Sequence, residues 1–366
     1  MIKILDSGIV YRNPKPFLRS IHAWHPSLAV NSKGELFATF DLGEAIESLN
    51  YRTYGARSTD GGATWSDPKP ILEDQTERRS THSVRVGSVS DGSLVCFGAR
   101  FYRDNPEEGL VNRANMGYVP IDLLLLRSQD FGNTWTKPQV IQTPFVGPSF
   151  EVCHAVVELK DGRWLIPTST WRGWNGESPN GMVAIALVSH DRGKTWPDVL
   201  HVFNQHDHGI FSWEQGLTQL NDGRLLSTVW CFDEKAGKSL PNVYAISDDG
   251  KTFSPPRENG LIGETAKLIT LPDGRVLCLY RRRDQPGLWA ATVAIEGDKW
   301  NTLEQVPIWQ GTASGMFGVN KSADELSALK FGYPIPVLMP NGDIVFVHWC
   351  VEESIHIIRW HRLRIE

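Results

Sequence analysis

The sequence predicts an all-β protein that folds as a six-bladed β-propeller. A hairpin pattern recurs six times along the 366 residues, a second turn motif recurs four times, and the composition is rich in glycine, proline and tryptophan. The hairpins lie 51 to 70 residues apart, which leaves room for four short strands in each repeat and is typical of propeller blades. We expect a single domain that spans residues 1–366.

Each hairpin consists of two runs of alternating apolar and polar residues that flank a turn. The alternation indicates strands, and a glycine in the turn supplies the positive φ that a tight hairpin requires. The hairpins occupy residues 26–41, 82–98, 153–169, 214–230, 265–281 and 333–349, and their turn glycines are Gly34, Gly92, Gly162, Gly223, Gly274 and Gly342.

The second motif reads Ser-x-Asp-x-Gly-x-Thr-Trp. It is intact at residues 58–65, 128–135 and 189–196 and shortened at 247–253. An aspartate in such a turn accepts hydrogen bonds from nearby backbone amides. We therefore interpret Asp60, Asp130 and Asp191 as structural.

These motifs are Asp boxes, and with them the sequence resembles the sialidase (neuraminidase) superfamily of BNR/Asp-box repeat proteins along nearly its whole length. The resemblance implies a six-bladed propeller whose Asp boxes lie on outer turns, far from the active site. We also expect residues 2–11 to pair with residues 355–365 as neighbouring strands. This pairing would close the ring and leave no free sheet edge between the first and last blades.

Composition narrows the classes of partner. The net charge is −5 and no basic stretch stands out, so we expect no nucleic acid partner. No apolar run approaches 18 residues, so we expect no membrane span. No signal peptide is visible, which predicts a cytoplasmic protein, or a secreted one if a signal was removed. The five cysteines lack CxxC spacing, so we expect buried free thiols, no metal and no cofactor.

The candidate site follows from the blade geometry, because the first strand of each hairpin should line the central funnel. Residues nine or ten positions before the turn glycine would then lie at its mouth, and the ends of the second strands would lie nearby. Tryptophan faces stack on pyranose rings, while charged and imidazole groups bind hydroxyls. We expect a glycan or oligosaccharide partner, held by Trp24, His82, Arg100, Glu151, His154, Arg172, Trp213, Trp230, Glu264 and Arg281.

The resemblance also implies catalytic roles. Tyr333 stands nine residues before its turn glycine, as the nucleophilic tyrosine of sialidases does, and Glu214 holds the position of the glutamate that partners it. The family places an acid/base on the loop after the first hairpin, where Asp41 is our first candidate and Glu47 the second. His25 is a further catalytic candidate, because histidine transfers protons near neutral pH.

The chain departs from the sialidase pattern at the arginines that bind the sialate carboxylate. Trp24-His25-Pro26 replaces the Arg-Ile-Pro signature, and Trp230 stands where a second arginine is expected. We therefore expect a sialidase-like exo-glycoside hydrolase that is not an orthodox sialidase. The alternatives are a propeller-type polysaccharide lyase or histidine-dependent glycosidase acting on a uronate-containing glycan, and a non-catalytic carbohydrate-binding propeller.

Overall fold

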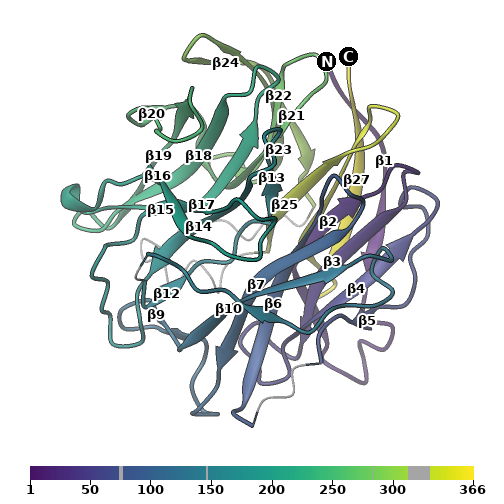
Figure 1. Cartoon of the computed structure of the whole chain (residues 1–366). Helices are drawn as coiled ribbons and strands as arrows, with labels where there is room; N and C mark the ends of the chain where they lie inside the picture. The colour runs from purple at the N-terminus through teal and green to yellow at the C-terminus, as the bar shows by residue number, and fades with distance from the viewer. Residues whose placement is uncertain (74–76, 146, 283, 312–329) are drawn as a thin grey trace.

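The computed structural model describes residues 1–73, 77–145, 147–282, 284–311 and 330–366. These residues are almost entirely β-structure, with a short 3-10 helix, η1 (His206–His208). Six antiparallel sheets follow one another and form the blades of a β-propeller (Figure 1). The fold class predicted from the hairpin repeat is confirmed.

The first three blades take the chain from the first hairpin to the third. Blade 1 contains β2 (His22–Val30), β3 (Leu36–Gly43), β4 (Arg52–Ser58) and β5 (Lys69–Pro70). Blade 2 contains β6 (Ser80–Ser88), β7 (Leu94–Tyr102), β10 (Ile121–Ser128) and β11 (Gln139–Val140). Blade 3 contains β12 (Ser149–Phe150), β13 (Val157–Glu158), β14 (Trp164–Trp171), β15 (Ala184–Ser189) and β16 (Asp198–Phe203). A small hairpin, β8 (Val111–Asn112) with β9 (Gly117–Tyr118), projects from blade 2.

The last three blades complete the ring. Blade 4 contains β17 (Ile210–Gln219), β18 (Leu225–Asp233), β19 (Lys238–Ser247) and β20 (Arg257–Glu258). Blade 5 contains β21 (Gly263–Thr270), β22 (Val276–Arg282), β23 (Gly287–Glu296) and β24 (Lys299–Trp309). Blade 6 contains β25 (Phe331–Leu338), β26 (Ile344–Glu352), β27 (Ile355–Ile365) and β1 (Ile2–Tyr11).

The first strands of the hairpins surround the centre of the ring. Strand β2 contacts both β6 and β25, and β21 contacts both β17 and β25, so neighbouring blades meet along these inner strands. The six turn glycines all have positive φ, from +80° at Gly34 to +97° at Gly223. Glycine adopts this conformation without the steric cost of a Cβ, which is why the turns recur in this form.

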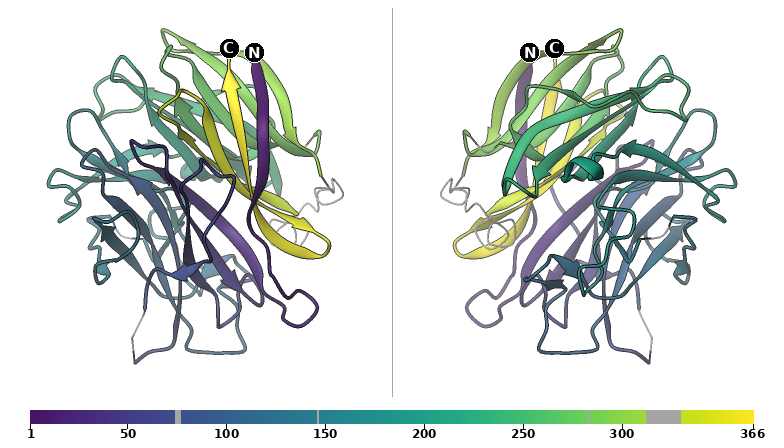
Figure 2. Two further views of the ribbon diagram at one scale, coloured as in Figure 1. Left: turned by 90° about the vertical axis from the view of Figure 1, so that its right-hand side faces the viewer. Right: turned by 90° about the vertical axis from the view of Figure 1, so that its left-hand side faces the viewer.

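The two ends of the chain close blade 6. Strand β1 pairs antiparallel with β27, from Ile2 opposite Ile365 to Tyr11 opposite Ile358. The N- and C-termini consequently lie side by side (Figure 2). The pairing predicted from the two terminal sequences is confirmed.

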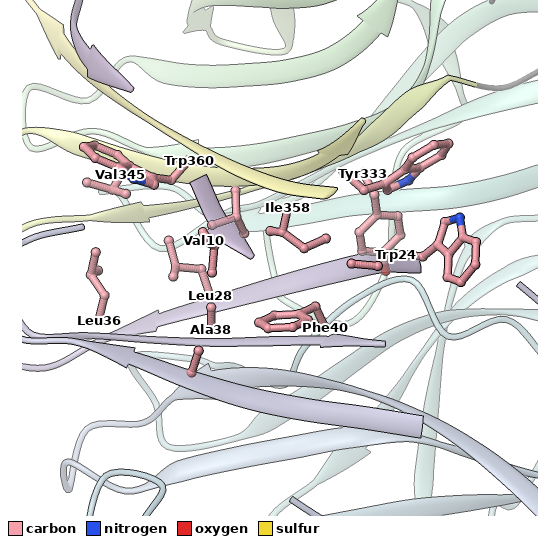
Figure 3. Packing of buried hydrophobic residues seen from close by; sticks show 14 of the residues in the cluster. Val10, Trp24, Leu28, Leu36, Ala38, Phe40, Tyr333, Val345, Ile358 and Trp360 are labelled. Atoms are coloured by element: carbon pink, nitrogen blue, oxygen red, sulfur yellow. The ribbon is translucent and has the colours of Figure 1, made fainter. Parts of the chain in front are cut away.

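The hydrophobic core between blades 6 and 1 extends from the Asp-box end of the blades to the centre of the ring. Leu36 and Val345 are buried at one end, Phe40 and Ile358 in the middle, and Tyr333 at the other (Figure 3). Burial of such side chains stabilises the fold by roughly 1.5–3 kcal/mol each. The same packing fixes the position of Tyr333.

Blade 3 departs from the expected pattern, because residues 151–156 form no regular strand between β12 and β13. Side chains take over part of the lost ladder. The Thr168 hydroxyl donates to the Glu151 carbonyl (2.6 Å), and the Gln215 amide of blade 4 donates to the Thr168 carbonyl (2.9 Å). The interruption leaves the Glu151 side chain facing the centre of the ring.

The Asp boxes form the turns between the last two strands of blades 1 to 3. In the box of blade 2, the Asp130 carboxylate accepts from the Ser128 hydroxyl (2.8 Å), the Thr134 amide (2.8 Å) and the Thr134 hydroxyl (2.6 Å). These donors, with the Thr134 hydroxyl first, lower the pKa of Asp130 to about 2. Asp60 and Asp191 make the same three contacts, so each box holds its turn in one conformation through side-chain hydrogen bonds.

The described part of the chain contains five cysteines, which are buried and free, as expected. No helix within it has the length and apolar character needed to cross a bilayer. Its histidine, cysteine, aspartate and glutamate side chains form no cluster of three or more that could hold a metal ion.

Candidate active site

A cavity of about 420 Å³ opens where the inner strands begin. Strand register places it at the opposite end of the blades from the Asp boxes: in blade 1, Trp24 pairs with Asp41 at the cavity end, whereas Leu36 pairs with the Asp-box residue Ser58. Nine residues predicted from the sequence line the cavity, namely Trp24, His25, Glu151, Trp213, Glu214, Trp230, Glu264, Arg281 and Tyr333. Five blades contribute these side chains.

A β-bulge near the start of the inner strand turns one residue of four blades toward the centre. The strand register shifts at this point in β2, β17, β21 and β25. The residue nine positions before the turn glycine has positive φ in each case: His25 (+45°), Glu214 (+49°), Thr265 (+50°) and Tyr333 (+60°). Such backbone costs about 1–3 kcal/mol per non-glycine residue and clusters at functional sites.

The phenol of Tyr333 lies between two cations. The Arg85 Nε donates to the phenolic oxygen (3.3 Å), which donates in turn to the Val152 carbonyl (3.3 Å). The Lys267 ammonium lies 5.3 Å from the centre of the ring. Burial raises the pKa of Tyr333 well above its usual value, and Arg85 opposes that rise. The site therefore holds a neutral phenol beside charges that would stabilise its anion.

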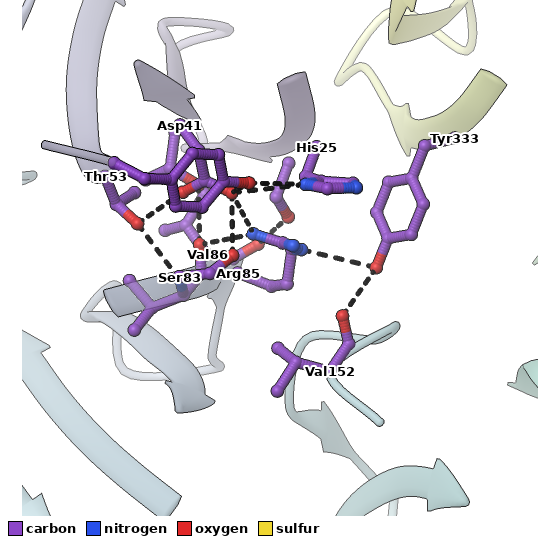
Figure 4. A network of polar contacts seen from close by, with 12 residues as sticks. His25, Asp41, Thr53, Ser83, Arg85, Val86, Val152 and Tyr333 are labelled. Carbon is purple, nitrogen blue, oxygen red and sulfur yellow. Dashed lines mark hydrogen bonds and ion pairs between the residues drawn. The ribbon is translucent and has the colours of Figure 1, made fainter. Parts of the chain in front are cut away.

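Asp41 lies on the other side of Arg85 from this phenol, in a buried network between blades 1 and 2 (Figure 4). One of its oxygens accepts from Tyr51 (2.7 Å), Ser83 (2.6 Å) and Arg85 (3.2 Å). Although burial by itself raises the pKa of the Asp41 carboxyl, Arg85 and the other donors hold it below its usual range. We expected Asp41 to face the substrate as the acid/base. It is fully buried instead, and it does not line the cavity.

Glu151 and Glu214 are neighbouring carboxyl groups on the other side of the cavity. The Glu151 carboxylate accepts from the Glu214 backbone amide (2.9 Å), and the Glu214 carboxylate accepts from the Trp230 indole (2.9 Å). Burial and the neighbouring Glu214 charge raise the pKa of Glu151 to about 7. Burial also raises the pKa of Glu214. A carboxyl group with a pKa near 7, such as that of Glu151, can give or take a proton at neutral pH and so suits acid–base chemistry.

The arginine of blade 5 that reaches the cavity is ion-paired. Arg281 forms a buried salt bridge with Glu264, with Nε 3.0 Å from the carboxylate, and also donates to the Phe331 carbonyl (3.3 Å). Arg85 is paired in the same way with Asp41. Both guanidinium groups are thus neutralised by the protein itself.

Aromatic side chains form two walls of the cavity. On the side of blades 3 and 4, Trp213 packs against Trp171 (5.2 Å between ring centres) and edge-on against Trp230 (4.5 Å). On the side of blades 1 and 6, His356 packs against Trp24 (4.8 Å) and Trp349 (5.5 Å). Such surfaces suit the apolar faces of sugar rings.

Five other predicted residues also lie outside the cavity. His82 and Arg100 face each other in the regular β6–β7 ladder, where no bulge turns a side chain inward. The Glu47 carboxylate accepts from the backbone amides of Leu110 and Val111 and so holds a rim loop. Arg172 forms a salt bridge with Glu234 and donates to the Asn115 carbonyl (3.1 Å), and the His154 ring contacts the Ala155 carbonyl (2.9 Å).

Sequence reasoning missed Tyr51, Arg85 and Lys267. The two cations were detectable, because each stands seven residues before a turn glycine with an apolar residue on either side in the inner strand. A charged residue in such a strand indicates a buried partner. Tyr51 carries no comparable signal, because it lies in the loop between β3 and β4.

A family model for the BNR repeat-like domain matches residues 101–349. The chain belongs to this family. A protein of unknown function from Dyadobacter fermentans is 19% identical, with a TM-score of 0.74 over 100% of this chain and 99% of that one. The K499G mutant of NanB sialidase from Streptococcus pneumoniae is 12% identical (TM-score 0.66, covering 97% and 70%), and the intramolecular trans-sialidase from Ruminococcus gnavus is 13% identical (TM-score 0.65, covering 94% of each). At these identities the likeness concerns the fold.

Proposed function

We propose that this BNR-repeat propeller is an exo-acting glycoside hydrolase whose substrate carries a terminal sugar other than sialic acid. The observation that carries the proposal is the convergence of the Tyr333 phenol with the neighbouring carboxyl groups of Glu151 and Glu214 in one cavity with aromatic walls. Sialidase-like enzymes use a tyrosine as the nucleophile, unlike most glycosidases.

The proposed chemistry assigns one role to each group. The Tyr333 oxygen attacks the anomeric carbon, and Arg85 stabilises the charge that develops on this oxygen. Glu151, which holds its proton near neutral pH, protonates the leaving oxygen and afterwards takes a proton from the attacking water. The charge of Glu214 helps to keep Glu151 protonated. The net reaction adds water across one glycosidic bond.

The choice against sialic acid rests on the arginines. A sialate carboxylate is best bound by unpaired guanidinium groups, which supply two parallel hydrogen bonds. Arg85 and Arg281 are already paired with Asp41 and Glu264. Tryptophans line the wall where two further arginines were expected, at Trp24 and Trp230.

The test is a panel of chromogenic glycosides of neutral sugars, uronic acids and an α-sialoside. We expect release from a neutral glycoside and little or none from the sialoside. Ordinary sialidase rates on the sialoside would refute the choice of sugar. Ligand binding without turnover of any glycoside would instead favour a carbohydrate-binding propeller.

A polysaccharide lyase is the second candidate, because the His25 imidazole lies against Tyr333 with 5.8 Å between ring centres. A histidine–tyrosine pair could transfer protons in a β-elimination on a uronate. The products separate the two functions: a lyase yields an unsaturated sugar that absorbs in the ultraviolet, whereas a hydrolase yields saturated reducing sugars.

A further inference from the structure

Three side chains of blade 1 form a hydrogen-bonded row that ends in the cavity. The Tyr51 hydroxyl lies 2.7 Å from the Asp41 carboxylate and 2.6 Å from His25 Nδ1. Tyr51 and Asp41 are buried, whereas the His25 side chain is 28% exposed and lines the cavity. The row therefore connects a buried anion to an imidazole that a substrate can reach.

The donors in this row can be assigned from the chemistry of the three groups. Asp41 is ionised and accepts all its hydrogen bonds, since Arg85 and the hydroxyl donors hold its pKa low. Burial raises the pKa of Tyr51 well above its usual value, so Tyr51 keeps its proton. A phenol has one proton to donate, and Asp41 receives it. The short contact with His25 then requires Nδ1–H as the donor and Tyr51 as the acceptor.

The second ring nitrogen of His25 follows from this assignment. Burial lowers the pKa of His25, against the pull of Asp41, so the ring is neutral near pH 7. A neutral imidazole with hydrogen on Nδ1 carries a lone pair on Nε2. Figure 4 shows the His25 ring between Asp41 and Tyr333, with one end of the ring toward Tyr333. The positive φ of His25 and the bulge at Trp24/Ser27 keep the ring in this orientation.

We infer that His25 is the base of this site. It accepts the Tyr333 phenolic proton on Nε2, directly or through one water, once the hydroxyl turns away from the Val152 carbonyl to which it donates in the free protein. Asp41 and Tyr51 are positioning residues, which fix the Nδ1–H tautomer of His25. As the phenolic oxygen bonds to the anomeric carbon, its proton passes to Nε2 and Glu151 gives its own proton to the leaving oxygen. In the second step water gives a proton to Glu151, its oxygen bonds to the anomeric carbon, and Tyr333 leaves and regains its proton from His25.

This base differs from the glutamate that the family resemblance implies. The Glu214 carboxylate accepts from the Trp230 indole, whereas the His25 ring lies against the Tyr333 ring with 5.8 Å between ring centres. The charged and titratable groups that face His25 are Asp41 and Tyr51 from blade 1, Arg85 from blade 2, and Tyr333 and His356 from blade 6.

The experiment measures the tautomer of His25 by nitrogen NMR of the free, full-length protein near pH 7. The His25 signals are identified by their loss in His25→Gln. We expect protonated Nδ1 and unprotonated Nε2 in the wild type, and a shift of population toward the Nε2–H tautomer in Tyr51→Phe. Ser83→Ala is the matched control, because it removes a donor from the same Asp41 oxygen (2.6 Å) without touching His25. This control should keep the wild-type tautomer.

A wild-type Nε2–H tautomer would overturn the inference, even if Tyr51→Phe failed to fold. An unchanged tautomer in a folded Tyr51→Phe variant would also overturn it. The kinetic measurement is the only part of this test that rests on the proposed function. Tyr51→Phe should lower kcat on a cleaved glycoside about 10-fold to 100-fold with little change in KM. It should also move the acid limb of the pH profile to lower pH. Unchanged kcat and pH profile in that variant would refute the positioning role, whereas an absence of any hydrolysis would refute only the proposed function.

Discussion

The two ends of the blades use the same repeat in opposite ways. At the outer end, three Asp boxes make the same hydrogen bonds with the same residue types. At the cavity end, four bulged strands share one backbone conformation but present four different side chains: His25, Glu214, Thr265 and Tyr333. A repeated side chain therefore marks the scaffold here, whereas varied side chains on a repeated backbone mark the candidate active site.

The largest effect should come from the cavity end. Tyr333→Phe keeps the ring and its packing between blades 6 and 1 but removes the attacking oxygen, so turnover of a cleaved glycoside should fall on the order of 10³-fold or more. Thermal unfolding checks that the variant folds. If Tyr333→Phe kept near wild-type turnover while His25→Ala was inactive, the tyrosine would not be the nucleophile and the reaction would depend on the histidine.

The next effect concerns proton transfer by Glu151. Its pKa is raised to about 7, and an acid must be protonated to act, so activity should decline as pH rises above about 7. Glu151→Gln should lower kcat by about 10²-fold or more and abolish this alkaline limb. A limb that persists unchanged in a partly active Glu151→Gln variant would assign the titration to another group.

The third prediction concerns the pH dependence of the free energy of unfolding, which we trace to two histidines in blade 6. His348 and His361 are buried with their Nε2 atoms 3.1 Å apart, and burial lowers the pKa of His361 to about 4. Because the unfolded histidines bind protons first, stability should be fully present above about pH 6.5 and decline toward pH 4, by on the order of 3 kcal/mol for His361.

Unfolding by denaturant at several pH values measures this loss. His361→Gln should flatten the decline between pH 6.5 and 4. The exposed His190, which pairs with Asp198 on the surface, supplies the control, and His190→Gln should leave the slope unchanged. Equal slopes in all three proteins would show that the buried pair does not govern acid stability.

The smallest effect should come from the Asp boxes. The Asp130 carboxylate is exposed, so its three turn bonds lie in a screened environment. Asp130→Ala should lower the free energy of unfolding by only about 0.5–1.5 kcal/mol and leave turnover per folded molecule intact. Loss of turnover in a folded variant would break the division between the two ends.

The same contrast explains what the sequence could predict. The blades, the turns and the closure by residues 2–11 and 355–365 follow from local patterns of alternation and glycine. The offset from the turn glycine also located His25 and Tyr333. These features depend on neighbours along the chain, which a sequence displays directly.

The rest depends on contacts between distant residues. Asp41 and Glu47 both resemble accessible carboxylates in the sequence, but Ser83 and Arg85 bury the first, and the loop at Leu110 binds the second. Bulges have no fixed sequence signal, so the sequence did not show that the strand with His82 continues as a regular ladder where the first strand of blade 1 bulges.

In the proposed mechanism the Tyr333 oxygen forms a covalent bond with the sugar. The most direct test uses a 2-deoxy-2-fluoro analogue of the sugar that the glycoside panel identifies, followed by mass spectrometry of the digested enzyme. We expect one added sugar on the peptide that contains Tyr333 in the wild-type enzyme, and no added sugar on the same peptide of Tyr333→Phe. A label on another residue, or steady hydrolysis of the panel substrate with no labelled peptide, would contradict it.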